Sequence, residues 1–135
     1  MHCFHRMTSF CVILPLHRNI MHELSIAIQI TEIIEEEAKN AGADTVLQVQ
    51  LEIGELSGVE MDALEMAMLE AVRGTIASEA ELIYHQIAAK AVCESCCNEF
   101  EPIDVFKICP FCNSLHTNLL KGKELKIRSI EVVTK

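Results

Sequence analysis

The sequence predicts an α/β (α+β) fold, with two helices on a small three-stranded mixed sheet and a four-cysteine module inserted before the last strand. Apolar residues recur at helical spacing over residues 24–41 and 59–72. Apolar and polar residues alternate, as in half-buried strands, over residues 44–53, 80–89 and 124–133. Two Cys-x-x-Cys pairs lie between the second and the third of these strands.

The two predicted helices have recognisable ends. Gly42 follows the first helix and Gly74 follows the second, and glycine commonly ends a helix because it tolerates positive φ. Ser57-x-x-Glu60 predicts a capping box at the start of the second helix. The methionines of that helix are expected to fill the core. The apolar stripe of the first helix comprises Leu24, Ala27, Ile28, Thr31, Ile34, Ala38 and Ala41.

The strands carry two topological expectations. The strand–helix–strand unit over residues 44–89 is typical of a right-handed parallel crossover. In the last strand the alternation changes phase after Ile127 and resumes at Ile130. A β-bulge near Arg128-Ser129 would restore the inward orientation of the apolar residues.

The paired cysteines predict a metal site. Cys93-x-x-Cys96 and Cys109-x-x-Cys112 are separated by 12 residues, which allows four sulfurs to converge on one tetrahedral ion. Thiolates in this geometry select zinc, or iron in a rubredoxin-like site. A four-thiolate site has no open position for a substrate, so a structural zinc-ribbon module is expected. Its small core is expected to comprise Phe100, Phe106, Ile108 and Phe111.

Two neighbouring residues have open roles. Cys97, next to Cys96, is either a spare thiol or an alternative ligand. His116, four residues after Cys112, is either a surface histidine or a residue that supports or replaces a thiolate.

Composition excludes several classes of protein. The net charge of −9 argues against a nucleic-acid partner, which would require a basic face. The chain has seven cysteines, an odd number, and four of them have metal-ligand spacing. This favours metal binding over a disulfide framework, and therefore a reducing compartment, the cytoplasm. No run approaches the roughly 18–20 apolar residues of a membrane span, so no membrane association is expected.

Residues 1–20 differ from the rest of the chain, with two arginines and no acidic residue. They resemble a disordered leader or the product of a misassigned start, and a targeting or regulatory extension is the alternative. The apolar stretch that contains Pro15 makes a poor signal peptide. Residues 21–90 plus 118–135 are expected to form the α/β domain, and residues 91–117 the zinc-binding domain.

Met21-His22-Glu23 precedes the first helix, and its chemistry depends on where the chain starts. Inside a chain it is an ordinary helix entry. At a free terminus, the α-amine, one or two backbone amides and the His22 imidazole can surround an ion in a square plane. That nitrogen set suits Ni(II) or Cu(II), and the Glu23 carboxylate could assist.

These residues together resemble the HypA/HybF family of hydrogenase nickel-incorporation proteins. The resemblance is carried, in order from Met21 to about Val132, by Met21-His22-Glu23-Leu24-Ser25, Gly54-Glu55-Leu56-Ser57 with Val59-Glu60, Gly74-Thr75, and the cysteine pairs with Cys109-Pro110. The cysteine pairs alone are generic, whereas their combination with the two earlier motifs is specific.

The resemblance implies a nickel metallochaperone for nickel–iron hydrogenase, and for urease in some organisms, built from a nickel-binding α/β domain and a zinc domain. It implies nickel ligands at Met21, His22 and Glu23, with Glu60 near the nickel, and structural zinc at Cys93, Cys96, Cys109 and Cys112. The implied partners are a HypB-type GTPase, the hydrogenase large subunit and urease maturation proteins, and a homodimer is compatible with it.

The chain departs from the family pattern at two places. Twenty residues precede Met21, so the amine that the resemblance makes a nickel ligand lies in a peptide bond. Cys97 stands where such knuckles often place glycine, while Asn113 at the matching position tolerates positive φ well.

Other functions predict other features. A zinc-ribbon adaptor for nucleic acid or a transcription complex would need a basic stripe with exposed aromatic residues. A rubredoxin-like electron carrier would contain iron and would not need the helical domain. No nucleophile–base pair, phosphate loop or open metal position supports an enzyme.

Overall fold

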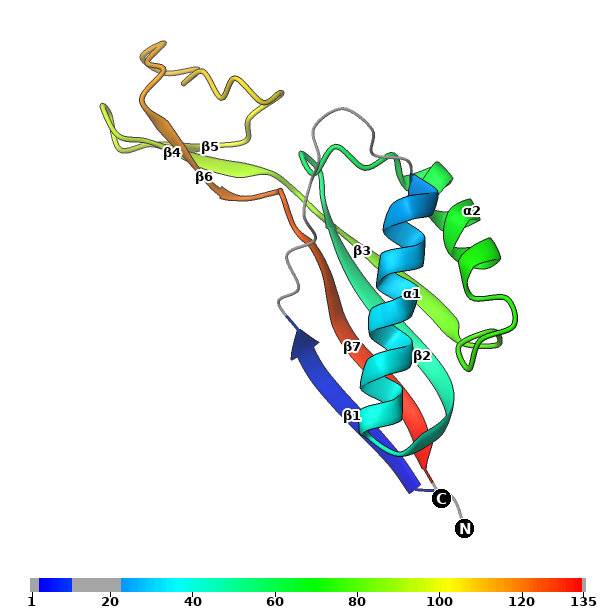
Figure 1. Cartoon of the computed structure of the whole chain (residues 1–135). Coiled ribbons are helices and arrows are strands. Elements are labelled where there is room, and N and C mark those ends of the chain that lie inside the picture. Colours follow the sequence, from blue (N-terminus) through cyan, green and yellow to red (C-terminus); the bar gives the residue numbers. More distant parts are fainter. Residues whose placement is uncertain (1–2, 11–22, 135) are drawn as a thin grey trace.

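The computed structural model describes the backbone of residues 3–10 and the whole of residues 23–134. The larger sheet has the strand order β1-β7-β2-β3, and a smaller one has the order β5-β4-β6. The smaller sheet belongs to a metal-binding module (residues 90–121) that projects from one end of the larger sheet (Figure 1). The elements are β1 (Cys3–Phe10), α1 (Glu23–Asn40), β2 (Ala43–Gly54), α2 (Met61–Ala71), β3 (Glu81–Ile87), β4 (Lys90–Cys93), β5 (Glu99–Phe100), β6 (Thr117–Lys121) and β7 (Leu125–Thr134).

The larger sheet is mixed, as predicted. β2 pairs with β3 in parallel, which confirms the parallel connection through α2, and β7 runs antiparallel to β2. The bulge in β7 is also confirmed: Gln50 pairs with Ser129 and Leu51 with Ile127, so Arg128 has no opposite residue in β2. As a result Ile127 and Ile130 are both buried although they are three residues apart.

Residues Cys3–Phe10 form a strand, an element that was not predicted from the sequence. β1 lies antiparallel to β7, in a register that runs from Cys3 opposite Thr134 to Phe10 opposite Ile127. The sheet therefore has four strands, one more than predicted. The physical reason is that the outer edge of β7 presents unpaired backbone groups that an extended segment can satisfy.

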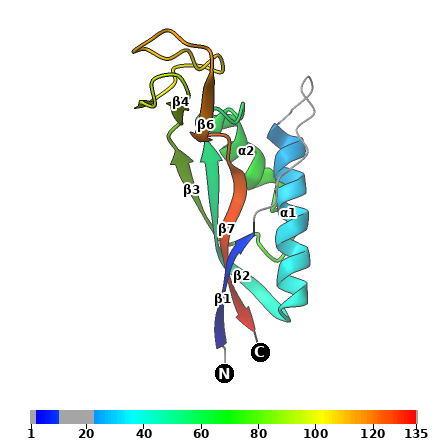
Figure 2. The ribbon, with the colours of Figure 1, turned by 90° about the vertical axis from the view of Figure 1, so that its left-hand side faces the viewer.

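Both helices lie on one face of the larger sheet (Figure 2). The buried face of α1 differs from the predicted stripe, because Leu24 is 47% exposed and Ile28 also faces solvent. The residues that α1 buries are Ile26, Ala27, Ile30, Thr31, Ile34 and Ala38. Thr31 satisfies its hydroxyl within the helix by donating to the Ala27 carbonyl at 2.8 Å.

The start of α2 differs from the predicted capping box. Glu60 itself is the N-cap, and its carboxylate accepts from the backbone N–H groups of Asp62 (3.4 Å) and Ala63 (2.7 Å). Ser57 instead accepts from the Val59 N–H with its hydroxyl, three residues before the cap. The expectation that the methionines of this helix fill the core holds only in part: Met68 is fully buried beside Leu64, whereas Met61 is partly buried and Met66 is 73% exposed.

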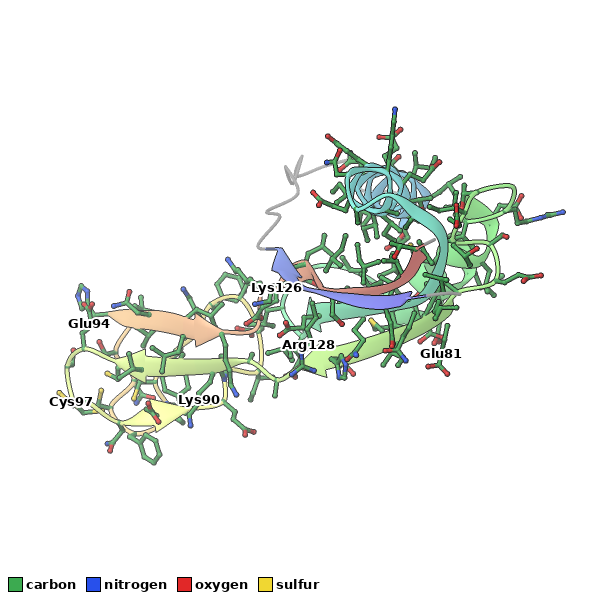
Figure 3. All side chains as sticks on the ribbon, turned by 90° about the horizontal axis from the view of Figure 1, so that it is seen from below. Glu81, Lys90, Glu94, Cys97, Lys126 and Arg128 are labelled. Carbon is green, nitrogen blue, oxygen red and sulfur yellow. The ribbon has the colours of Figure 1, made fainter. Side chains whose placement is uncertain are left out.

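The opposite face of the larger sheet carries a row of polar side chains. Gln48 donates to Glu81, Gln50 donates to Gln48, and the His85 ring nitrogen lies 2.8 Å from Gln50 Oε1. Figure 3 shows Glu81 and Arg128 on this side, away from α1. Among residues 23–134, no helix is long and apolar enough to cross a membrane.

Candidate metal centre

The four predicted cysteines converge. The sulfurs of Cys93, Cys96, Cys109 and Cys112 all lie within 4.8 Å of one another. Cys93 Sγ is 3.5 Å from Cys112 Sγ, and Cys96 Sγ is 3.6 Å from Cys109 Sγ. Cys93 ends β4, whereas the second pair lies in the loop between β5 and β6.

The two cysteine pairs sit in matching turns. The Cys93 N–H donates to the Asn98 carbonyl (2.9 Å), and the Cys109 N–H donates to the Ser114 carbonyl (3.0 Å). Each turn closes through a residue at positive φ, Cys97 in the first (63°) and Asn113 in the second (60°). The repeated geometry presents both pairs of sulfurs to the same point.

The surroundings of the sulfurs favour thiolates. The Cys96 N–H donates to Cys93 Sγ (3.5 Å), the Phe111 N–H donates to Cys109 Sγ (3.4 Å), and the Asn98 amide donates to Cys96 Sγ (3.4 Å). Hydrogen bonds to the charged form of a group stabilise that form. Four converging sulfurs, three of which accept such hydrogen bonds, suit a tetrahedral zinc ion held without an open position.

Protonation differs sharply between two of the four thiols. The backbone N–H of Cys96, helped by that of Ser95, lowers the pKa of the Cys93 thiol from 9.0 to about 6 despite its burial. At Cys112 the backbone N–H of Ser114 acts to lower the pKa, but the neighbouring thiols and burial outweigh it and raise the pKa to about 12. These two facing thiols interact closely, so they titrate as a pair and not independently.

Cys97 and His116 lie outside the group of converging ligands. Cys97 is exposed, and Figure 3 shows it at the outer tip of the module. His116 is also exposed; its carbonyl accepts from the Glu94 N–H (2.8 Å) and its N–H donates to Ser114 Oγ (3.0 Å). Both positions agree with the simpler interpretation of each residue, a spare thiol and a surface histidine.

The core of the module is smaller than predicted. Of the four predicted core residues only Phe100 is buried, whereas Phe106 is 71% and Phe111 is 65% exposed, and Ile108 also faces solvent. The buried hydrophobic cluster consists of Ala91, Cys93, Phe100 and Cys109. A three-stranded sheet with no helix against it has little interior, so the metal ligands themselves make up half of this core.

The residues predicted for nickel are placed only in part. Met21 and His22 lie outside the described residues. Glu23 is the first residue of α1, and its carboxylate accepts from the backbone N–H of Glu60 at 3.3 Å. Two acidic residues that are 37 positions apart in the sequence are thus brought together at the start of the two helices.

Sequence reasoning missed the residues that support the cysteine turns. Asn98 donates to a cysteine sulfur, and Ser95 links the two turns through a contact with Ser114 at 2.9 Å. Their signal in the sequence is weak, because small polar residues are common in any turn. Only the repeated pattern of a polar residue shortly after each cysteine pair could have indicated them.

Comparison with known proteins was consistent across sequence and structure. The sequence profile of the family described as "Hydrogenase/urease nickel incorporation, metallochaperone, hypA" matches residues 21–132. A hydrogenase maturation factor HypA from Parabacteroides distasonis is 45% identical over 112 residues, which are 83% of this chain and 97% of that protein. The HypA of Geobacter metallireducens is 38% identical over 112 residues, or 83% and 99% of the two chains.

The fold agrees with a solved structure. The solution structure of the Ni metallochaperone HypA from Helicobacter pylori superposes with a TM-score of 0.62 at 24% identity, covering 85% of this chain and 100% of that one. The profile match covers most of the chain, and the sequence relatives are matched over nearly their full length. The chain therefore belongs to the HypA family of nickel-incorporation metallochaperones, which serve hydrogenase maturation.

Proposed function

We propose that this protein delivers Ni(II) to a nickel–iron hydrogenase during its maturation. The observation that carries the proposal is the family match over residues 21–132, which begins at the Met21-His22-Glu23 motif. A carrier must release its ion, which favours a solvent-facing site of modest affinity over a closed cage. We expect a site at the start of α1 to have that character.

The proposed nickel ligands are the Met21 amine, the His22 amide and imidazole, and the Glu23 amide or carboxylate. The contact between the Glu23 carboxylate and the Glu60 N–H supports a role for Glu60 beside the nickel. Because the Glu60 carboxylate caps α2, it is fixed in place and would contribute negative charge rather than a mobile ligand. A nitrogen-rich planar set suits Ni(II) better than zinc.

Zinc is proposed as the resident metal at Cys93, Cys96, Cys109 and Cys112, in a structural role. The closed sulfur set and the small core support this assignment. In such modules zinc binding contributes on the order of 10–16 kcal/mol to folding. The two metals thus have separate roles, since zinc folds the module and nickel is the cargo.

The proposal includes the cell compartment and the partners. The protein is expected to act in the cytoplasm, as a carrier rather than a catalyst. Its expected partners are a HypB-type GTPase and the hydrogenase large subunit, with urease maturation as a further use. The net charge of −9 supports protein partners over nucleic acid.

A nickel titration tests the proposed site. Zinc-loaded protein would be titrated by calorimetry in two versions, one beginning at Met1 and one with a free amine at Met21. Binding of about one nickel per chain in the Met21 version alone would support the terminal site. Equal binding in both versions would remove the amine from the ligand set.

Histidine variants provide the matched control. His22→Ala should abolish specific nickel binding in the Met21 version while zinc content stays unchanged. His116→Ala, which removes an exposed imidazole from the far module, should leave nickel binding as it was. A His22→Ala protein with unchanged nickel affinity would contradict the proposal.

A further inference from the structure

The Gly54-Glu55-Leu56-Ser57 segment lies where the two parts of the molecule join. The chain enters the metal-binding module after β3, through residues 88–89, and leaves it before β7, through residues 122–124. These two connections form a narrow neck (Figure 1). Residues 54–57, which begin at the end of β2, contact both connections.

Four hydrogen bonds join this segment to the neck. On the entering side, the Glu55 N–H donates to the Ile87 carbonyl (2.8 Å), and the Glu55 carboxylate accepts from the Ala89 N–H (2.9 Å). On the leaving side, the Leu56 N–H donates to the Gly122 carbonyl and the Gly54 N–H donates to the Glu124 carbonyl, both at 2.6 Å. One short segment therefore ties both connections to the end of β2.

The approach is so close that it requires glycine. A Cβ atom on Gly54 would lie 2.2 Å from the Gly122 carbonyl oxygen. A Cβ atom on Gly122 would lie 2.6 Å from the Ala89 Cα, and Gly122 also has a φ of +122°. These obstacles are backbone atoms, which cannot rotate away as a flexible side chain would. The neck therefore has little freedom to open while these contacts hold.

The same segment leads to the start of the helices. Five residues after Glu55 the chain reaches Glu60, which caps α2 and whose N–H donates to the Glu23 carboxylate. The loop is thus bonded to the neck at one end and to the first residue of α1 at the other.

We propose that residues 54–57 form a clasp that holds the metal-binding module in one orientation relative to the α/β domain, with Glu55 as its positioning residue. The clasp fixes the position of the module's outer surface relative to the start of α1. A partner that contacts both surfaces would therefore find them in one fixed arrangement. This inference does not depend on nickel binding and is tested without nickel.

The first experiment compares Glu55→Ala with Glu55→Gln in the zinc-loaded full chain. The glutamine carbonyl can still accept from the Ala89 N–H, whereas alanine cannot. In Glu55→Ala, amide hydrogen exchange at Ala89 should be about ten- to a hundredfold faster, the factor that corresponds to a hydrogen bond to a charged group. Glu55→Gln should restore most of the protection. Equal protection of Ala89 in the wild type and in Glu55→Ala would overturn the role of Glu55.

The second experiment measures the motion of the module directly by ¹⁵N relaxation. In the wild type, the amides of residues 90–121 should share one rotational correlation time with those of α1. Gly122→Ala should give the module a shorter correlation time of its own. Gly58→Ala is the matched control, since Gly58 also has positive φ (+83°) but an added Cβ would meet nothing within 4 Å.

Zinc content, measured on every variant, separates loosening of the neck from loss of the module fold. Zinc-loaded Gly122→Ala with independent module tumbling, beside Gly58→Ala with common tumbling, would support the clasp. Independent tumbling in the wild type would overturn it, as would common tumbling in zinc-loaded Gly122→Ala. If Gly122→Ala fails to fold, the tumbling of the wild type still tests the clasp, and the comparison of Glu55→Ala with Glu55→Gln still tests the role of Glu55.

Discussion

Replacing Phe100 with alanine should weaken zinc binding although the side chain is not a ligand. Phe100 is 7% exposed and belongs to a core of only four buried residues. Truncation of a buried phenylalanine costs about 3–5 kcal/mol. Because folding of a thiolate module is coupled to metal binding, that loss lowers the apparent zinc affinity. At about 1.4 kcal/mol per factor of ten, the expected weakening is roughly 100-fold to 4,000-fold.

The assay is competition for zinc against a chromophoric chelator at fixed pH. Phe111→Ala is the matched control, since it removes the same group from a side chain that is 65% exposed in the same module. Exposed truncations usually change stability by about 0.5 kcal/mol or less, so zinc affinity should change by no more than about threefold.

Two results would refute this reasoning. Unchanged zinc affinity in Phe100→Ala would mean that the module keeps its fold without its one buried aromatic side chain. An equal loss of zinc affinity in Phe111→Ala would mean that the difference in exposure does not distinguish the two rings. That result is expected if a partner or a second copy of the chain covers Phe111.

Three further predictions concern buried side chains. Tyr84→Phe should leave stability unchanged or raise it by about 1 kcal/mol in thermal unfolding, since the buried hydroxyl has no hydrogen-bond partner among the described residues. The pKa of this hydroxyl is raised to about 12 by its burial and by the nearby charge of Glu65. Met68→Ala should lower the free energy of unfolding by about 2–5 kcal/mol, because Met68 is fully buried. Met66→Ala, at a side chain 73% exposed on the same helix, should lower it by about 0.5 kcal/mol or less, and equal losses would contradict the packing. Zinc binding at pH 7 should release protons, because the four cysteines bind the metal as thiolates; calorimetry in buffers of different ionisation enthalpy measures how many.

The parts of the fold set by local pattern could be predicted from the sequence. Alternation over residues 44–53 and 80–89 identified β2 and β3, and the change of phase in the last strand identified the bulge at Arg128. The convergence of the four cysteines followed from their spacing alone. Each of these signals lies within a short window, where side-chain period or ligand spacing leaves few alternatives.

The parts set by distant contacts could not be predicted. The sequence around Ser57 has the form of a capping box, but residues 54–57 are bonded to a neck formed by residues more than 30 positions later. The cap therefore moves to Glu60. The buried face of α1 was ambiguous for a related reason, since apolar residues occur on more than one side of that helix and the sheet selects among them.

The N-terminal strand has a consequence for the nickel experiment. β1 covers the outer edge of β7, and a long edge rich in β-branched residues readily pairs with another chain when it is uncovered. A version that begins at Met21 thus differs from the full chain in two ways, a free amine and an exposed edge. Acetylating the amine of the Met21 version separates them, because that protein has the exposed edge but no amine ligand. If nickel binding is lost on acetylation, the amine binds the metal; if it persists, the gain came from removing β1.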